Sequence, residues 1–359
     1  MRYAIKCTVN GGSGTEQKKM ASLLHHEHTF LQASGGNCGK FFPAVPYTGL
    51  GGPPGYGFTA DKKFCFFVME RMAAPLSEIV PILKKASSSK IALGGVAVAL
   101  FDCIHAIHTL GYLHRDVKLD NFMLASSPSN NDEDVPSRIR LIDFGLVAQE
   151  IFYRRKTNSH GEDDGVQLLV GTPIYASLNV MVGGTPSRGD DLEALGYVIC
   201  EVILMLLLRS SGSGGDGSEG EGGQGVLPWS HAKSDDELYQ IKQEEMDKSK
   251  RSNSTLFAEL NAAGVEVQMS KYFNEVMNLK PAEKPDYDSL RGHLNKIVVT
   301  TAASISRDGG KKPAAAAASP KKPAAEATGA QKSPRRTKGK GLGVNVSSSD
   351  ENVENGVQA

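Results

Sequence analysis

The sequence predicts an α+β fold in three parts: a region with short strands at residues 1–71, a mostly helical region at residues 72–298, and a disordered basic tail at residues 299–359. β-Favouring apolar residues are concentrated in the first part. Helical periodicity and long apolar segments dominate the second part. Beyond residue 303 the repeated Lys-Lys-Pro-Ala, Ser-Pro and Arg-Arg composition is of low complexity.

The composition supports a globular body with a charged appendage. The 359 residues are 40% hydrophobic, and 40 Lys and Arg balance 40 Asp and Glu. This excludes wholesale disorder and a uniformly basic nucleic-acid binder. Residues 311–340 hold nine basic residues and one acid, a net charge of +8, so the rest of the chain carries −8. A basic tail therefore follows a mildly acidic body.

The first part begins with a strand at residues 2–9, and a Gly/Ser break at 11–14 precedes a helix at 15–32. Residues 35–57 are expected to form a Gly/Pro-rich loop with room for one short strand, and 63–69 a buried strand. One face of the helix carries a carboxylate among apolar residues, and a buried carboxylate needs a partner. That face consists of Met20, Leu23, Leu24, Glu27 and Leu31.

The second part turns helical from residue 77, with a long apolar segment at 91–110. Short strands are expected at 122–124 and 139–142, on either side of a polar hairpin loop at 126–137. The apolar run 195–208 has fourteen residues and contains Glu201. A bilayer span needs about twenty, so we expect a buried core helix and no membrane contact. Eight glycines in residues 211–225 predict a floppy surface insertion, after which helical patterning continues to about residue 298.

Cysteine and histidine patterns give no sign of a metal or disulfide site. The five cysteines, Cys7, Cys38, Cys65, Cys103 and Cys200, are odd in number and form no C-x-x-C pair, which favours a reducing compartment. No secretory signal is recognisable at the N-terminus, so we expect a cytoplasmic or nuclear protein. Several histidines are spaced as on helices without a matching set of ligands, and we interpret them as helix surface or core: His25, His26, His28, His105 and His108.

Two short segments suggest the chemistry: HRDVKLDN at residues 114–121 and DFG at 143–145. Phosphoryl transfer requires a positioned hydroxyl, a triphosphate with its metal ions, and neutralisation of developing charge. Asp116 is suited to orient the hydroxyl, Lys118 to neutralise the moving phosphoryl group, and Asn121 with Asp143 to bind Mg²⁺. Either segment alone is weak, but together at this spacing they are a strong signal.

A lysine strand precedes these motifs. YAIK at residues 3–6 is similar to the V-A-I-K strand, and Glu27 on the apolar helix face is a fitting partner for Lys6. A lone A-I-K is common, so this assignment depends on the downstream motifs.

The chain resembles eukaryotic protein kinases of the casein kinase I group and their vaccinia-related relatives, and the resemblance covers residues 2–298. Beside the two catalytic motifs, four segments match in the right order: GTPIYASLN at 171–179, SRGDDLEALGY at 187–197, LPWS at 227–230 and EKPDYDSLR at 283–291. The resemblance implies a two-lobed protein kinase fold with a truncated N-lobe sheet, a mostly helical C-lobe, and Ser/Thr protein kinase activity with ATP and Mg²⁺. Which of the two branches it joins is left open.

The resemblance also implies roles for single residues. Asp116 would be the catalytic base, Lys118 the γ-phosphate contact, and Asn121 and Asp143 the metal ligands. Asp191 would hold the backbone of the catalytic loop. The remaining assignments concern the nucleotide. Lys6, paired with Glu27, would hold its α- and β-phosphates. Met69 would be the gatekeeper and Glu70 to Met72 would be the hinge, while Ala4 and Met123 would lie on the two sides of the adenine ring.

The sequence departs from this family at its front. Met1 stands five residues before Lys6, which leaves no room for the glycine-rich turn that covers the phosphates, and no other glycine-rich stretch is placed to replace it. Either the recorded start is wrong and an upstream strand pair exists, which we prefer, or the protein is a truncated kinase that binds nucleotide weakly. An inactive kinase-fold scaffold that binds partners without turnover is the alternative function.

Two features bear on partners, which we expect to include protein substrates of a monomeric enzyme. Arg188 matches a candidate anion site for acidic or phosphorylated substrates, although three acids lie nearby at 162–164. The basic tail, with Ser-Pro sites at Ser319 and Ser333, is interpreted either as a contact for nucleic acid or an import receptor, or as a solvated tether.

Overall fold

The computed structural model describes residues 3–9, 15–38, 40–45, 56–59, 61, 63–78, 90–125, 135–150, 171–208 and 225–300. Residues 211–224 of the insertion predicted at 211–225, and the tail beyond residue 300, lie outside these residues. All described residues fall in one compact unit, residues 1–310. The α+β class predicted from the sequence agrees with what they form, since small antiparallel sheets accompany a set of helices.

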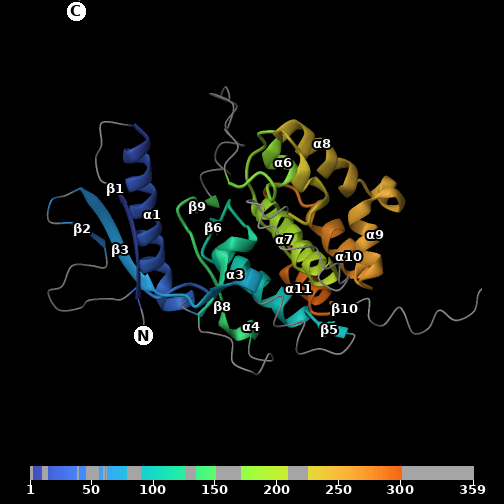
Figure 1. Cartoon of the computed structure of the whole chain (residues 1–359), viewed down its shortest axis with the longest axis horizontal. Coiled ribbons are helices and arrows are strands. Elements are labelled where there is room, and N and C mark those ends of the chain that lie inside the picture. Colours follow the sequence, from blue (N-terminus) through green and yellow to red (C-terminus); the bar gives the residue numbers. More distant parts are fainter. Residues whose placement is uncertain are drawn as a thin grey trace, which may run out of the picture. The chain divides into compact units, whose positions relative to one another are not determined.

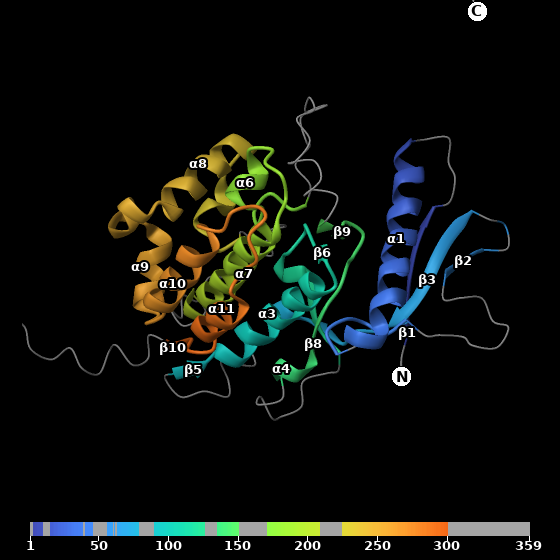
Figure 2. The same cartoon turned by 180° about the vertical axis from the view of Figure 1, so that it is seen from behind.

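The N-terminal part is a three-stranded antiparallel sheet with one helix against it (Figures 1 and 2). Its strands are β1 (Tyr3–Val9), β3 (Phe64–Glu70) and β2 (Tyr56–Phe58), in the order β1-β3-β2, and its helix is α1 (Thr15–Cys38). Alternate β1 side chains are exposed, and the others, which include Ala4 and Lys6, are half-buried on the face that meets α1. The predicted strands at 2–9 and 63–69 are thus confirmed.

The predicted loop at 35–57 was partly wrong. Helix α1 continues through Gly35 and Gly36 to Cys38, whereas β2, which begins at Tyr56, agrees with the short strand for which the loop had room. Each glycine costs a helix about 1 kcal/mol, but extending a formed helix adds a backbone hydrogen bond per residue, and local composition does not show that balance. On the same helix Met20 is 50% exposed, whereas the buried stripe runs through Leu24, Glu27 and Leu31.

The second part is built around α7 (Arg188–Leu208), and the predicted core helix at 195–208 is confirmed within it. Helices α3 (Gly94–Thr109), α9 (Thr255–Ala262) and α10 (Glu266–Val276) pack against α7. The other helices among the described residues of this part are α4 (Val135–Arg138), α6 (Leu178–Met181), α8 (Asp235–Met246) and α11 (Tyr287–Leu294), with 3₁₀ turns at Leu76–Glu78, Leu119–Asn121, Pro228–His231 and Lys248–Asn253.

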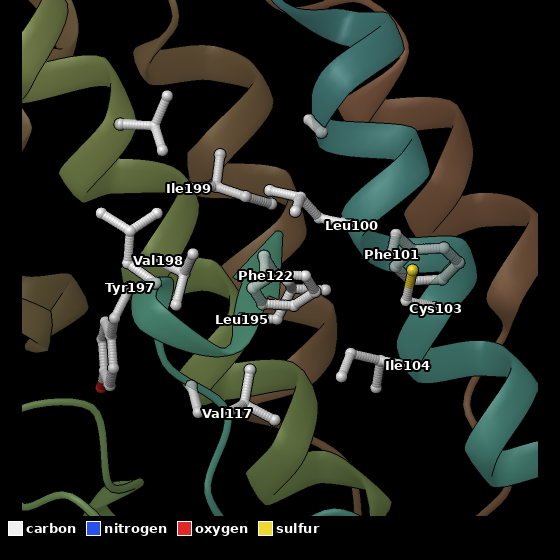
Figure 3. Close-up of a cluster of buried hydrophobic side chains, with 14 of the residues drawn as sticks. Leu100, Phe101, Cys103, Ile104, Val117, Phe122, Leu195, Tyr197, Val198 and Ile199 are labelled. Carbon is white, nitrogen blue, oxygen red and sulfur yellow. The ribbon is translucent and has the colours of Figure 1, made fainter. Parts of the chain in front are cut away.

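Apolar side chains of α3 and α7 interdigitate in the core (Figure 3). Leu100 and Ile104 of α3 and Leu195 of α7 are at most 1% exposed. Each such side chain contributes about 1.5–3 kcal/mol on burial. At Gly196 a Cβ atom would lie 2.5 Å from the Phe273 ring of α10, so only glycine permits this close approach. Among the described residues no helix is long and apolar enough to span a bilayer.

Short antiparallel strand pairs frame the catalytic segment predicted at 114–121. Strands β6 (Tyr112–Leu113) and β9 (Ala148–Gln149) pair with each other, and β7 (Phe122–Leu124) lies between β4 (Ala74–Pro75) and β8 (Ile139–Leu141). The strands predicted at 122–124 and 139–142 are therefore confirmed as neighbours. Residues 126–134 of the predicted hairpin loop lie outside the described residues.

Two expectations about local structure were wrong where long-range contacts decide the structure. Strands β5 (Lys90–Ala92) and β10 (Val298–Thr300) pair with each other, although helical patterning was expected at 90–92 and the disordered tail was expected to begin at residue 299. The end of the predicted loop, residues 135–137, forms α4 together with residue 138, and Val135 is fully buried in the core. Pairing and burial of this kind depend on residues far away in sequence, so local periodicity does not reveal them.

Candidate active site

Residues 114–121 join β6 to β7, and hydrogen bonds to the side chain of Asp191, at the start of α7, hold them in place. The Asp191 carboxylate, 3% exposed, accepts hydrogen bonds from the backbone N–H groups of His114 at 2.7 Å and Arg115 at 2.9 Å. His108 Nε2 lies 3.0 Å from the same carboxylate. Arg115 has a φ of 68°, a strained value for a residue other than glycine. The anchor therefore holds the loop in a conformation that the chain would not adopt by itself.

The hydrogen bonds to Asp191 also set its ionisation. Burial acts to raise the pKa of this carboxyl, but the hydrogen bonds from His108 and the Arg115 N–H, together with nearby histidine rings, outweigh burial, and the pKa is lowered. Asp191 therefore stays ionised and places a negative charge next to the backbone of His114 and Arg115.

Asp116 lies at the centre of a side-chain network. Its Oδ2 is 2.9 Å from Lys118 Nζ, and its Oδ1 accepts a hydrogen bond from Thr172 Oγ1 at 2.8 Å. Lys118 Nζ also donates to Thr172 Oγ1 at 3.2 Å, and Asn121 Nδ2 donates to the Asp116 carbonyl at 2.8 Å. The sequence placed Asp116, Lys118 and Asn121 together, and the structure does the same.

Thr172 was missed by the sequence reasoning. It is the second residue of the segment GTPIYASLN, which was noted there only as a family likeness. The preceding Gly171 has a φ of 99°, and a Cβ atom on it would lie 2.5 Å from the Arg115 carbonyl. A glycine before a hydroxyl residue, in a segment that follows catalytic motifs, was the available signal.

A second cluster forms around Lys6, and its three members come from distant parts of the chain. Lys6 Nζ of β1 lies 2.6 Å from Glu27 Oε2 of α1 and 2.9 Å from Asp143 Oδ1, shortly after β8. The predicted pairing of Lys6 with Glu27 is therefore present, and Glu27 is only 2% exposed. Asp143 has a φ of 64°, a second strained position.

The charges in this cluster stabilise one another. Burial acts to lower the pKa of Lys6, but the carboxylates of Glu27 and Asp143 outweigh it, and the pKa is raised. For Asp143, burial acts in the raising direction and Lys6 outweighs it, so the pKa is lowered. For Glu27, burial prevails over Lys6 and raises the pKa. Lys6 therefore remains charged, as a residue that contacts phosphate must.

The strand register brings Asn121 and Asp143 into one neighbourhood. Phe122 pairs with Leu141, and the Ile142 N–H donates to the Asn121 carbonyl at 2.8 Å. Mg²⁺ in phosphoryl-transfer sites takes only one or two protein oxygens, together with phosphate and water. The Nδ2 atom of Asn121 donates to Asp116, and Oδ1 of Asp143 accepts from Lys6. The amide oxygen of Asn121 and Oδ2 of Asp143 are the atoms suited to be metal ligands. These two oxygens fit an Mg²⁺ ion shared with a nucleotide.

The residues expected around adenine lie on the strands that border this site. Ala4 on β1 and Met69 on β3 are directly opposite each other. Met123 on β7 is half-buried and pairs with Pro75 on β4. The Glu70 N–H is occupied by the Ala44 carbonyl at 2.7 Å. Within the described residues no hydrogen bond occupies the main chain of Arg71 or Met72. Of the expected hinge, Arg71 and Met72 are thus the positions with their backbone available.

Arg188, the candidate anion site, is already paired. Its Nε and Nη2 donate to Glu150 Oε2 at 3.1 Å and 2.8 Å, and both side chains are largely buried. Its positive charge is therefore compensated within the protein. The basic residues at 154–156 lie outside the described residues.

The histidines of the predicted surface-or-core group divide between the two places. His25 and His26 are exposed on α1, whereas His28 and His108 are buried. Within the part of the chain that the structure describes, no three His, Cys, Asp or Glu side chains group as metal ligands.

A hollow lies beside Asp116, between the loop at 114–121 and the segment that follows Thr172. Its walls come from both segments and from the start of α7, and they are mainly small or apolar: Val117, Tyr175, Ala176, Val180, Gly184 and Pro186. The hollow opens next to the carboxylate expected to orient the hydroxyl. A side chain of a bound peptide would find space there.

Comparison with known proteins supports the chemistry suggested by this geometry. The model of the protein kinase domain family matches residues 55–219. The chain is 27% identical over 246 residues to the casein kinase I homolog RAG8 of Kluyveromyces lactis. The aligned residues make up 68% of this chain and 40% of the relative. The chain thus spans less than half the length of that protein. With these matches, the α+β protein kinase fold expected from the sequence is confirmed.

Proposed function

This casein kinase I-like chain carries a protein kinase domain, and from that premise we propose that it transfers the γ-phosphate of ATP to serine or threonine hydroxyls of proteins. One observation carries the proposal: Lys6 Nζ lies within 3 Å of both Glu27, which is 21 residues away in sequence, and Asp143, which is 137 residues away. Asp116, Lys118 and Thr172 form a second network. Chance loops would not bring together this set of residue types.

Each residue has a defined task in this reaction. Lys6, held by Glu27, would bind the nucleotide phosphates, and Asn121 with Asp143 would hold Mg²⁺, which supplies charge neutralisation at the transferred phosphoryl group. Asp116 would orient the acceptor hydroxyl and take its proton, and Lys118 would neutralise charge on the γ-phosphate.

The adenine base would lie between Ala4 and Met123, with Met69 as gatekeeper. The hinge would be Glu70 to Met72, and the available main chain of Arg71 and Met72 makes them the expected hydrogen-bonding positions. Apolar side chains at these places would exclude water from the base.

The test compares phosphate transfer by the full chain with transfer by Asp116→Asn, using casein and the chain itself as acceptors. Asp116→Asn should lose transfer while retaining stabilisation by Mg²⁺-ATP in a thermal melt. The control, Asp288→Asn on the exposed face of α11, should match the wild type. Transfer unchanged in Asp116→Asn would reject the assignment. Saturable ATP stabilisation without any transfer by the wild type would instead favour the kinase-fold scaffold.

The same proposal extends to substrates and location. The preference for acidic substrates expected from Arg188 is weakened because Glu150 already compensates its charge, and equal rates on acidic and neutral peptides would end it. The tail is proposed to direct a monomeric, cytoplasmic or nuclear protein to an import receptor or nucleic acid through its net charge of +8 at residues 311–340. Diffuse distribution of a reporter fused to residues 303–359 would remove the nuclear part.

A further inference from the structure

Lys242 on α8 is a lysine with no exposed surface, a rare state for this residue type. Its Nζ donates hydrogen bonds to the carbonyl oxygens of Ala176 at 2.7 Å and Pro173 at 3.2 Å. The ammonium also lies 4.9 Å from the centre of the Tyr197 ring and 5.3 Å from that of Trp229. The cation is thus enclosed by two aromatic rings and two carbonyls of one segment.

That segment, residues 172–178, is bound by side chains of the helical part along most of its length. Trp229 Nε1 donates to the Ile174 carbonyl at 2.8 Å, and Glu193 Oε1 accepts from the Leu178 N–H at 2.8 Å. Among the described residues, Lys242 makes the only hydrogen bond to the Ala176 carbonyl, whereas the Pro173 carbonyl also accepts from the Ala176 N–H at 3.2 Å. The Ala176 carbonyl therefore depends on Lys242 for its hydrogen bond.

The segment is also the wall of the proposed reaction site. Thr172 at its start bonds to both Asp116 and Lys118, and Tyr175, Ala176 and Ser177 line the hollow beside Asp116. A shift of the Ala176 carbonyl would therefore move both the hydroxyl that contacts Asp116 and one wall of the hollow.

Folding alone does not explain a lysine at this place. Burial lowers the pKa of Lys242 to about 7 despite the nearby Glu193 carboxyl, which shows how poorly the site solvates a charge. Replacing buried ionic groups by apolar ones of similar volume is often neutral or stabilising. A methionine would fill the space between Tyr197 and Trp229, but it would leave the Ala176 carbonyl without a donor.

We propose that Lys242 is a positioning residue: it fixes residues 172–178 against Asp116 so that the acceptor peptide and its hydroxyl are held in place. Lys242 acts through the Ala176 and Pro173 carbonyls and touches neither nucleotide nor hydroxyl. The inference rests on the proposed kinase function for its kinetic consequences, but its structural consequence is independent of activity.

The test uses Lys242→Met in the full chain, with Lys271→Met, an exposed lysine on α10, as the matched control. Lys242→Met should lower the thermal midpoint, because the buried Ala176 carbonyl loses its donor, but the variant should remain folded at the assay temperature. Its kcat/KM for peptide should fall about ten- to hundredfold, because residues 172–178 would no longer hold the peptide and its hydroxyl in place. The KM for ATP should change less than about twofold, because Lys6 and Asp143 are not involved. Lys271→Met should match the wild type in all three.

Hydrogen exchange gives a readout that does not need catalysis. Amides of residues 174–178 should exchange faster in Lys242→Met, while amides of β1 and α3 remain as in the wild type. Unchanged exchange at 174–178 would overturn the proposal even if the wild type transfers no phosphate. A general loss of stability with equal effects on ATP and peptide would also overturn it, because it would show that Lys242 only fills the core.

Discussion

Removing the Asp191 carboxylate should destabilise the protein more than any single surface change. In Asp191→Ala the backbone N–H groups of His114 and Arg115 lose their acceptor at a position that is 3% exposed, and His108 Nε2 loses its partner. Each buried donor left unpaired costs about 1–3 kcal/mol. Two backbone donors therefore predict a loss of roughly 2–6 kcal/mol in the free energy of unfolding.

Urea unfolding at neutral pH, followed by circular dichroism, measures this loss. Asp191→Asn should show about half of it, because the amide retains one acceptor oxygen but places an N–H₂ against the other donor. Asp288→Ala, an exposed carboxylate in the first turn of α11, should stay within about 0.5 kcal/mol of the wild type.

The variant should also lose phosphate transfer, because Arg115 holds its φ of 68° only while Asp191 anchors the loop. An Asp191→Ala protein within about 1 kcal/mol of the wild type would refute the reasoning, since it would mean that the two N–H groups find water or another acceptor at no cost.

Two further predictions concern the reaction site. Lys6→Met should reduce kcat/KM for ATP by about a hundredfold or more, since it removes the cation expected to hold the phosphates, and the binding of an ATP analogue by calorimetry should weaken in parallel. Gly171→Ala should lower kcat by about tenfold or more, because a Cβ atom would lie 2.5 Å from the Arg115 carbonyl at a φ of 99° that disfavours alanine; steady-state kinetics with unchanged ATP binding would support this, and wild-type kcat would contradict it.

The sequence was sufficient for elements whose signal is local. Strands β1, β3, β7 and β8 and the core of α7 have runs of β-favouring or apolar residues, and they lie where these runs predict. The catalytic residues were found because their order along the chain is itself a pattern. Lys6 and Glu27 were matched by a chemical need, since a carboxylate on an apolar helix face requires a partner.

What the sequence concealed depends on contacts between distant segments. Thr172, Lys242 and Glu193 each have an ordinary local setting, and only packing of residues 172–178 against α7 and α8 gives them their roles. The pairing of β5 with β10 joins residues about two hundred positions apart, beyond the reach of periodicity. Arg188 appeared as a free cation in the sequence because Glu150 is 38 residues away from it.

Glu193 makes the support of this segment sensitive to pH. Burial raises the pKa of its carboxyl to about 7, despite hydrogen bonds from Tyr197 and the Leu178 N–H and the nearby Lys242, with Asp190 adding to the upward shift. A folded-state pKa above the unfolded value gives stability that is complete at low pH and is lost as pH rises through about 7.

Glu193→Gln removes this titration while its amide oxygen can still accept from Leu178. The thermal midpoint of the wild type should therefore fall relative to that of Glu193→Gln between pH 5 and about 8, whereas exposed Glu259→Gln on α9 should give a constant difference from the wild type. Parallel curves for wild type and Glu193→Gln would mean that Glu193 is ionised throughout this range, and that Lys242 neutralises it as a buried ion pair beneath the segment.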